Sequence, residues 1–218
     1  DYGDCVFDFG KPDTIHSSIQ AHVAGILDQG TATLTIGGDH FITYPILEAY
    51  ASHHGPLSLI HFDAHSDTWP EPGERMDHGT MFYHATRRGL IDDQRSVQIG
   101  LRTTNDDPLG FTILDARYVH QHSATNIAEQ VKRVVGSDKV YLTFDIDCLD
   151  PSFAPGTGTP VCGGLSTYQA LEIIRALEGI NLVGMDVVEV APAYDAGDIT
   201  ALAASTIAME LLCLFAAR

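Results

Sequence analysis

The sequence has 218 residues, of which 44% are hydrophobic and 19% charged, a balance typical of a single folded domain spanning residues 1–218. Its formal net charge of −17 disfavours a nucleic acid or an anionic membrane as a partner. The charge favours a cationic ligand or metal ions, although an acidic surface also serves solubility. The four cysteines are scattered without a C-x-x-C pair, which indicates neither a zinc ribbon nor a disulfide framework and favours a reducing cytosol.

Short apolar strands alternate with helices along the chain. Helical spacing of apolar residues predicts a helix over 12–29 and further helices over 42–52, 80–88, 125–135, 167–177 and 196–217. Short apolar or β-branched runs predict strands over 32–36, 57–62, 96–99, 111–114, 140–144 and 182–188. This alternation predicts a three-layer α/β/α fold with a mostly parallel sheet covered on both faces.

Acidic and imidazole side chains alternate directly after the strand predicted over 57–62. A strand places alternate residues on one face, so Asp63, His65 and Asp67 can converge where it ends. Carboxylates with a single imidazole suit Mn²⁺ or Mg²⁺ and differ from the thiolate-rich sets that hold structural zinc. In isolation, the same pattern also fits a solvated loop. The residues after the other predicted strands are needed to distinguish a metal site from such a loop.

Three more predicted strands end in polar residues. Gly37-Gly38-Asp39-His40 follow the strand over 32–36, Asp145 and Asp147 follow 140–144, and Glu189 follows 182–188. The carboxyl ends of parallel strands form one rim, where ligands bind. The sequence therefore predicts one polar site at this rim.

The charge of this predicted site fits two divalent cations. Four carboxylates, Asp63, Asp67, Asp145 and Asp147, match two such ions, and His40 and His65 can each bind one. A metal pair lowers the pKa of water and supplies a hydroxide, which is hydrolytic machinery. Glu189 is kept out of the ligand set, because a free carboxylate there can bind a planar guanidinium through paired hydrogen bonds.

Four stretches follow one another along the chain as motifs. They are Gly37-Gly38-Asp39-His40, Asp63-Ala64-His65-Ser66-Asp67, Phe144-Asp145-Ile146-Asp147-Cys148-Leu149-Asp150-Pro151 and Asp186-Val187-Val188-Glu189-Val190-Ala191-Pro192. In this order they resemble the signatures of the ureohydrolases, the family of arginases and agmatinases, with bacterial agmatinases the most similar. The resemblance extends over essentially the whole chain and implies an arginase-like fold.

The resemblance also implies a role for each residue. His40, Asp63, Asp67 and Asp145 match the ligands of one Mn²⁺, and Asp63, His65, Asp145 and Asp147 match those of a second, so that Asp63 and Asp145 bridge two Mn²⁺ per chain. Glu189 matches the carboxylate that binds the guanidinium group. His78 matches the histidine that passes a proton to the leaving amine, a role suited to imidazole near neutral pH.

The reaction implied by the resemblance is the hydrolysis of agmatine to putrescine and urea, a step of polyamine biosynthesis. The expected setting is a cytoplasmic homo-oligomer, a trimer or hexamer, with no nucleic-acid or membrane partner. The loop over 68–77 lacks the Asn-, Ser- and Thr-rich residues that, by resemblance to arginases, would bind the amino-acid end of the substrate. Its acids Glu71, Glu74 and Asp77 favour a dicationic substrate, whereas Arg75 leaves room for 4-guanidinobutyrate, so guanidinobutyrase and arginase-like activities stay open.

Agmatinases carry several tens of residues before the position that matches Asp1, and this sequence begins without Met. We therefore expect a chain truncated at its N-terminus. This expectation leaves a second kind of protein open, an inactive form that binds metal or associates with other subunits.

Other polar residues have no motif around them. We expect surface or packing roles for five histidines, namely His53, His54, His61, His120 and His122. Cys148 is expected to be a small buried group facing away from the ligands, and residues 156–160 a loop at the rim of the site, because they lack the Lys-Ser/Thr ending of a phosphate loop. Asp39 and Asp186 are expected either to orient ligands or to cap local structure.

Overall fold

A computed structural model describes residues 1–70, 73 and 75–218. Within this part of the chain, one sheet has six strands in the order β1-β6-β5-β2-β3-β4, and every pair of neighbours is parallel. The strands are β1 (Leu34–Ile36), β2 (Ser58–Phe62), β3 (Val97–Ile99), β4 (Thr112–Leu114), β5 (Val140–Asp145) and β6 (Leu182–Val188).

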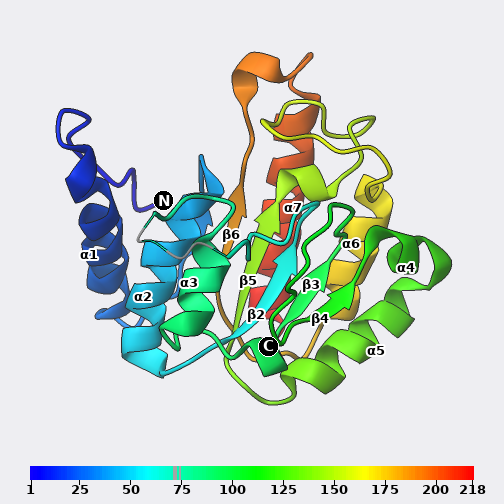
Figure 1. The fold of residues 1–218 in the computed structure, drawn as a ribbon, viewed down its shortest axis with the longest axis horizontal. Coiled ribbons are helices and arrows are strands. Elements are labelled where there is room, and N and C mark those ends of the chain that lie inside the picture. The colour runs from blue at the N-terminus through cyan, green and yellow to red at the C-terminus, as the bar shows by residue number, and fades with distance from the viewer. Residues whose placement is uncertain (71–72, 74) are drawn as a thin grey trace.

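Helices cover both faces of the sheet (Figure 1). One layer contains α1 (Ile15–Leu27), α2 (Thr43–His54) and α3 (Met81–Arg87). The other contains α4 (Ala116–Gln121), α5 (Ala124–Val135), α6 (Thr167–Ala176) and α7 (Ile199–Ala216). The predicted three-layer α/β/α architecture is confirmed.

The central strands are mostly apolar because both of their faces are covered. In β2, Leu59 packs into the core under α1, α2 and α3, whereas Ile60 and Phe62 pack into the core under α5, α6 and α7. All residues of β2, β5 and β6 are buried. A parallel sheet between two helical layers requires this pattern.

Local signals set several helix ends. Ser166 and Gln169 form a reciprocal capping box at the start of α6. Gly136 follows α5 with a φ of 57°, a left-handed conformation that glycine adopts without steric cost. These signals account for the agreement between the predicted and observed ends of α5 and α6.

Three helices differ from the prediction. The first one, α1, is preceded by a separate 3-10 turn over Pro12–Thr14, so it begins three residues later than predicted, and it ends two residues earlier. The last helix begins at Ile199, three residues later than predicted, because the Asp195 carboxylate accepts hydrogen bonds from the backbone N–H groups of Thr200 and Ala201. The short helix α4 was not predicted. It has only six residues and depends on Asp115, whose side chain accepts from the Tyr118 N–H, so it is too short to show an apolar period.

The strand order gathers four polar strand ends. The strands β1, β6, β5 and β2 are consecutive neighbours in the sheet. From β2 the chain continues to β3 on one side, and from β5 it continues to β6 on the other. Where successive connections leave in opposite directions, a crevice opens at the carboxyl edge of a parallel sheet. The predicted site residues follow the four strands next to this crevice.

In the described part of the chain, α7 has the length and composition of a membrane-spanning helix, with 18 residues and a mean hydropathy of 1.9. Ile207 and Leu211 of this helix are buried in the core against the sheet. One third of the helix is buried, whereas Leu202 and Met209 are exposed.

Candidate active site

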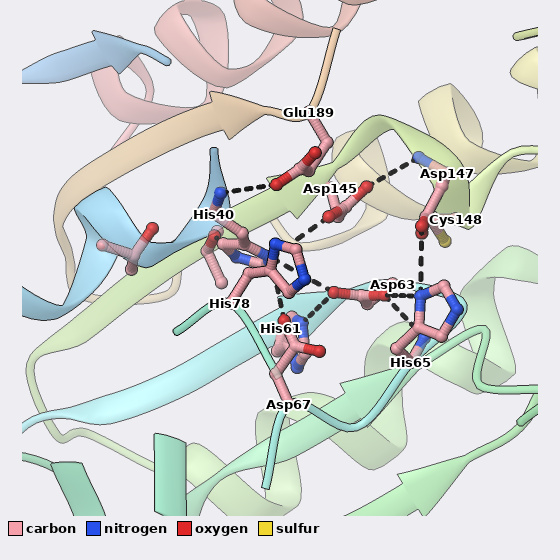
Figure 2. Close-up of polar contacts among 12 residues, drawn as sticks. His40, His61, Asp63, His65, Asp67, His78, Asp145, Asp147, Cys148 and Glu189 are labelled. Carbon is pink, nitrogen blue, oxygen red and sulfur yellow. Dashed lines mark hydrogen bonds and ion pairs between the residues drawn. The ribbon is translucent and has the colours of Figure 1, made fainter. Parts of the chain in front are cut away.

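The six predicted metal ligands converge at the carboxyl edge of the sheet (Figure 2). Five of them are buried and His65 is partly exposed. We call these six residues the floor cluster: His40, Asp63, His65, Asp67, Asp145 and Asp147. The structure brings together residues at or just after the carboxyl ends of β1, β2 and β5, as the sequence predicts.

One half of the floor cluster surrounds His40. Its Nδ1 lies 3.2 Å from Asp63 Oδ2, 3.2 Å from Asp67 Oδ2 and 3.1 Å from Asp145 Oδ2. This nitrogen is buried, yet it makes no hydrogen bond of acceptable geometry with any described residue. Adjacent donor atoms around one small divalent ion are about 3 Å apart, so an ion among these four atoms fits the donor set and satisfies the orphaned nitrogen.

The other half of the floor cluster surrounds His65. Its Nδ1 lies 3.3 Å from Asp63 Oδ1 and 3.1 Å from Asp147 Oδ2. Asp63 therefore turns one carboxylate oxygen to His40 and the other to His65. This is the arrangement of a carboxylate that bridges two metal ions.

Asp145 takes part in the first half only. Its Oδ2 faces His40, and its Oδ1 accepts a hydrogen bond of 2.8 Å from the backbone N–H of Asp147. Asp147 in turn accepts from the Ala64 N–H through Oδ1. The bridging role that the family resemblance implies for Asp145 stays a prediction.

A buried chain of hydrogen bonds fixes the ring of His40. Thr143 donates its hydroxyl proton to Asp186 Oδ1 at 2.5 Å, so its oxygen is left to accept from His40 Nε2 at 2.8 Å. Burial alone would lower the pKa of His40, but the carboxylates of Asp145, Asp63 and Asp67 raise it well above its usual range. When an ion displaces the proton that faces them, the neutral ring keeps its other proton on Nε2, and Nδ1 offers a lone pair to the ion. Asp186, fully buried, orients a predicted ligand, one of the two roles expected for it.

Crowding of these acids changes their protonation. Burial and the charge of Asp63 raise the pKa of Asp67 to about 6, and burial with the charges of Asp147 and Asp63 raises the pKa of Asp145 well above its usual range. Burial alone would lower the pKa of His65, but hydrogen bonds to Asp147 and Asp63 raise it to about 10. The cluster thus holds protons that a divalent cation would displace.

A second set of residues lies above the floor cluster. Asp39, His78 and Glu189 bring one polar atom each within 4.8 Å of one another, and we call them the rim group. His78 Nδ1 is 3.1 Å from Asp39 Oδ2, and Glu189 Oε1 accepts from the His40 N–H at 2.6 Å. Asp39 also accepts from the Phe41 N–H, so it both caps a turn and contacts a predicted catalytic residue.

A cavity of about 110 Å³ separates the floor cluster from the rim group. It is lined by His40, His65, Asp67, Asp145, His78 and Glu189 together with Trp69 and Thr159. Burial raises the pKa of Glu189 above its usual range, and the bond from the His40 N–H partly offsets this. A carboxylate in this position can bind a cation that enters the cavity.

Two site residues have an unusual backbone. Asp67 has a φ of 52° and Glu189 a φ of 66°, two of the four non-glycine residues with positive φ in the described chain. Side chains rarely adopt this left-handed region unless the surrounding structure enforces it, and such residues concentrate at functional sites. Both strand ends are therefore shaped to aim a carboxylate at the cavity.

The comparison with known proteins decides the family. The profile of the arginase family matches residues 1–214. The chain belongs to the arginase family. All 218 residues align with 71% of the agmatinase of Proteus mirabilis at 57% identity.

Two crystal structures extend this family assignment to the fold. A hypothetical agmatinase from Burkholderia thailandensis superposes with a TM-score of 0.96 at 58% identity, over 98% of this chain and 68% of that one. The proclavaminate amidino hydrolase from Streptomyces clavuligerus superposes with a TM-score of 0.89 at 41% identity, over 96% of this chain and 72% of that one. These superpositions confirm the predicted arginase-like fold. Arginase-family enzymes depend on two metal ions, and the floor cluster offers His and Asp ligands for them.

Sequence reasoning missed Arg102 in this arginase-family site. Its guanidinium donates to five backbone carbonyl groups, and the described chain places no carboxylate against it. One of these carbonyls belongs to Asp147, at 2.6 Å, and another to Val161 of the loop behind it. Arg102 therefore ties the turn that carries a predicted ligand to the neighbouring loop. Because its partners are backbone atoms, no sequence motif predicts this role of Arg102.

The expectation for His61 was incomplete. This side chain is fully buried against Phe82, but its Nε2 also lies 2.7 Å from Asp63 Oδ2. His61 thus contacts the floor cluster directly and is not a mere packing residue. The signal was available, because His61 precedes Asp63 by two positions and alternation along β2 places both on one side.

Other predictions around the site have mixed outcomes. Cys148 is buried as predicted, with Sγ 3.6 Å from the Ile99 carbonyl. The rim loop is confirmed by Thr159, which lines the cavity and donates to Asp147 Oδ2. Of the residues invoked for substrate choice, Arg75 pairs with Asp77 at 2.7 Å, whereas Glu71 and Glu74 lie outside the described residues.

Proposed function

We propose that this chain is an agmatinase, which hydrolyses agmatine to putrescine and urea with two Mn²⁺ bound to the floor cluster. The observation that carries the proposal is Asp63, whose two oxygens face two separate histidine-containing groups. The identity of 57% to an agmatinase across the whole chain supports the substrate. The proposal treats residues 1–218 as one catalytic domain.

The floor cluster would hold the ions as two groups. His40, Asp67 and Asp145 would bind one, His65 and Asp147 the other, and Asp63 both. A bound metal pair lowers the pKa of water toward neutrality and so supplies the nucleophile for hydrolysis. Oxygen-rich ligands with one imidazole per ion suit Mn²⁺.

The rim group would bind and orient the substrate. Glu189 lines the cavity and has one oxygen fixed by the His40 N–H, so its carboxylate is preoriented to accept hydrogen bonds from a guanidinium. That contact would hold the guanidinium carbon above the floor cluster. It would also keep the reacting group in the orientation that hydrolysis requires.

His78 would supply the proton for the leaving amine. Burial alone would lower its pKa, but the hydrogen bond to Asp39 raises it, which keeps more of the ring protonated near neutral pH. Because Nδ1 is bonded to Asp39, Nε2 is the nitrogen that donates. The carbon–nitrogen bond breaks as this proton reaches the departing nitrogen, and water supplies the oxygen of urea.

The test is the release of urea from the Mn²⁺-loaded protein. We expect agmatine to be hydrolysed with a higher kcat/KM than arginine or 4-guanidinobutyrate. A preference for arginine would overturn the proposed substrate. Two bound Mn²⁺ without urea from any of the three compounds would overturn the proposed reaction.

The relatives include an amidino hydrolase named for proclavaminate, at 41% identity. This match keeps other amidino compounds as the second candidate substrate class, which the same assay distinguishes when proclavaminate-type substrates are added. We place the proposed reaction in polyamine biosynthesis, in the cytoplasm and in a homo-oligomer. Light scattering on the purified protein tests the assembly.

A further inference from the structure

His61 occupies a position between the floor cluster and the strand that neighbours β2. Its side chain is fully buried, and its ring packs edge-on against Phe82 with centroids 4.7 Å apart. Its Nε2 belongs to a group of possible ligand atoms that includes those of His40, Asp63 and Asp67. Two roles fit this position: His61 is a further metal ligand, or it orients one of the ligands.

Hydrogen bonds to the other ring nitrogen distinguish the two roles. Gln98 of β3 is the register partner of His61, and its Nε2 lies 3.0 Å from His61 Nδ1. The same amide nitrogen lies 2.6 Å from the backbone carbonyl oxygen of Ser66. A carbonyl oxygen only accepts hydrogen bonds, so the atom facing it has to be the amide nitrogen.

The orientation of the Gln98 amide fixes the direction of the hydrogen bonds that link Gln98, His61 and Asp63. With its orientation set by Ser66, Gln98 donates to His61 Nδ1, which therefore carries a lone pair. The proton of the neutral ring then lies on Nε2 and is donated to Asp63 Oδ2 at 2.7 Å. A protonated nitrogen has no lone pair for a metal ion.

The unpaired amide oxygen does not change this assignment. Gln98 Oε1 is buried and has no hydrogen-bond partner among the described residues, which is a cost of this orientation. The reverse orientation costs more. Reversing the amide would place two oxygens 2.6 Å apart at Ser66.

We propose that His61 is a positioning residue: it donates Nε2–H to Asp63 and holds this carboxylate in its bridging orientation, and Gln98 fixes the ring for that task. The inference rests on the proposed function, because it takes Asp63 as a metal ligand. A carboxylate oxygen has two lone pairs, so Oδ2 can accept from His61 and still face the ion held near His40.

Neutron diffraction from deuterium-exchanged crystals of the metal-free protein tests the hydrogen-bond direction. We expect a deuteron on His61 Nε2 and none on Nδ1. A deuteron on Nδ1 overturns the inference whatever the metal content or activity of the protein. In the Gln98→Met variant, which loses the donor to Nδ1, the deuteron should no longer be confined to Nε2, and an unchanged ring would remove Gln98 from the account.

Mn²⁺ affinity, measured from free Mn²⁺ by electron paramagnetic resonance, tests the consequence. His61→Leu should weaken Mn²⁺ binding by about 10- to 100-fold, as loss of a residue that orients a ligand does. His61→Gln keeps an N–H donor near the Nε2 position and should restore most of the affinity. A Leu variant that folds and binds Mn²⁺ as tightly as the unchanged chain contradicts the inference.

The outcomes separate this inference from the proposed function. If the unchanged chain binds two Mn²⁺ and releases urea but His61→Leu is normal, only the inference fails. If the unchanged chain binds no Mn²⁺, the proposed function fails, and the deuteron still decides the direction of the hydrogen bond. A Mn²⁺ ion bonded to Nε2 in a loaded crystal would make His61 a ligand and overturn the positioning role.

Discussion

The floor cluster and the rim group face the same cavity but are held in different ways. The side chains of His40 and Asp63 are each 1% exposed, and buried hydrogen bonds fix them, from His40 to Thr143 and from His61 to Asp63. In the rim group, the side chains of His78 and Asp39 are 53% and 57% exposed. Within the described chain, the one hydrogen bond of the His78 side chain is to Asp39.

This difference separates two parts of the proposed chemistry. The floor cluster is arranged before any ligand arrives, so its task is to bind ions whose positions the protein dictates. In the rim group, the exposed side chains of His78 and Asp39 have freedom to adjust to a substrate. Substitutions in the floor should therefore remove metal and activity together, whereas substitutions in the rim should lower activity and leave the metal in place.

The largest effect is expected from Asp63→Asn. An amide has a single oxygen for ligation and loses the negative charge shared by both halves of the cluster, so both ions should be lost and urea release should fall to background. Metal content by plasma mass spectrometry together with urea release measures this. Asp28→Asn, the same change at an exposed position, serves as the control, and full metal content in Asp63→Asn would refute the bridging assignment.

Asp67→Asn should have a smaller effect on metal content. Asp67 contacts only the His40 half of the floor cluster, so we expect about one Mn²⁺ per chain to remain, at the His65 half. A titration with Mn²⁺ that counts bound ions distinguishes this variant from Asp63→Asn. Equal loss in both variants would mean that the two halves do not bind metal separately.

His78→Ala should separate the rim from the floor. Loss of a general acid lowers turnover by about 10²- to 10⁴-fold, while Mn²⁺ content should stay at that of the unchanged chain. His53→Ala, on the outer surface of α2, is the matched control. Undiminished kcat in His78→Ala would remove His78 from the mechanism. Loss of metal in this variant would contradict the assignment of metal binding to the floor cluster alone.

The affinity for Mn²⁺ should depend on pH. The pKa of Asp67 is raised to about 6 in the metal-free cluster, so below that pH a proton occupies this carboxylate and competes with the ion. Affinity should fall with falling pH over the whole range, because His65, with a pKa of about 10, also has to lose a proton, and it should fall more steeply below about pH 6, by about tenfold per pH unit for each proton displaced. Isothermal titration between pH 5 and pH 8 measures the slope, and Asp67→Asn should reduce it; a flat profile would contradict the protonation state.

The smallest effect is expected from Asp39→Asn. The Asp39 carboxylate raises the pKa of His78, and His78 has to be protonated to donate. Activity that is lost as the pH rises through the His78 pKa should therefore be lost at a lower pH in this variant, by about one pH unit at most. A pH profile of kcat records the shift, and no shift would mean that another group controls this limb.

The floor cluster was predictable from sequence for a physical reason. Alternation along a strand fixes the side to which Asp63 points, and parallel strands bring their carboxyl ends to one edge. The same alternation places His61, two residues before Asp63, on the same side, so it would have included His61 in the predicted site. The fold followed from short apolar runs that only a doubly covered parallel sheet accommodates.

The hydrogen-bond partners of the supporting residues were not predictable from sequence because they depend on strand order. Thr143 and Asp186 are register partners on β5 and β6, as are His61 and Gln98 on β2 and β3. Before the order of the strands is known, nothing connects these positions along the chain. Arg102 is a further case, since it recognises backbone carbonyls, which every sequence has.

The most direct test of the floor cluster is an anomalous difference map from crystals of the Mn²⁺-loaded protein, recorded at the manganese edge. We expect two peaks, one beside His40 and one beside His65, with Asp63 in contact with both. A single peak, or peaks away from the floor cluster, would contradict it.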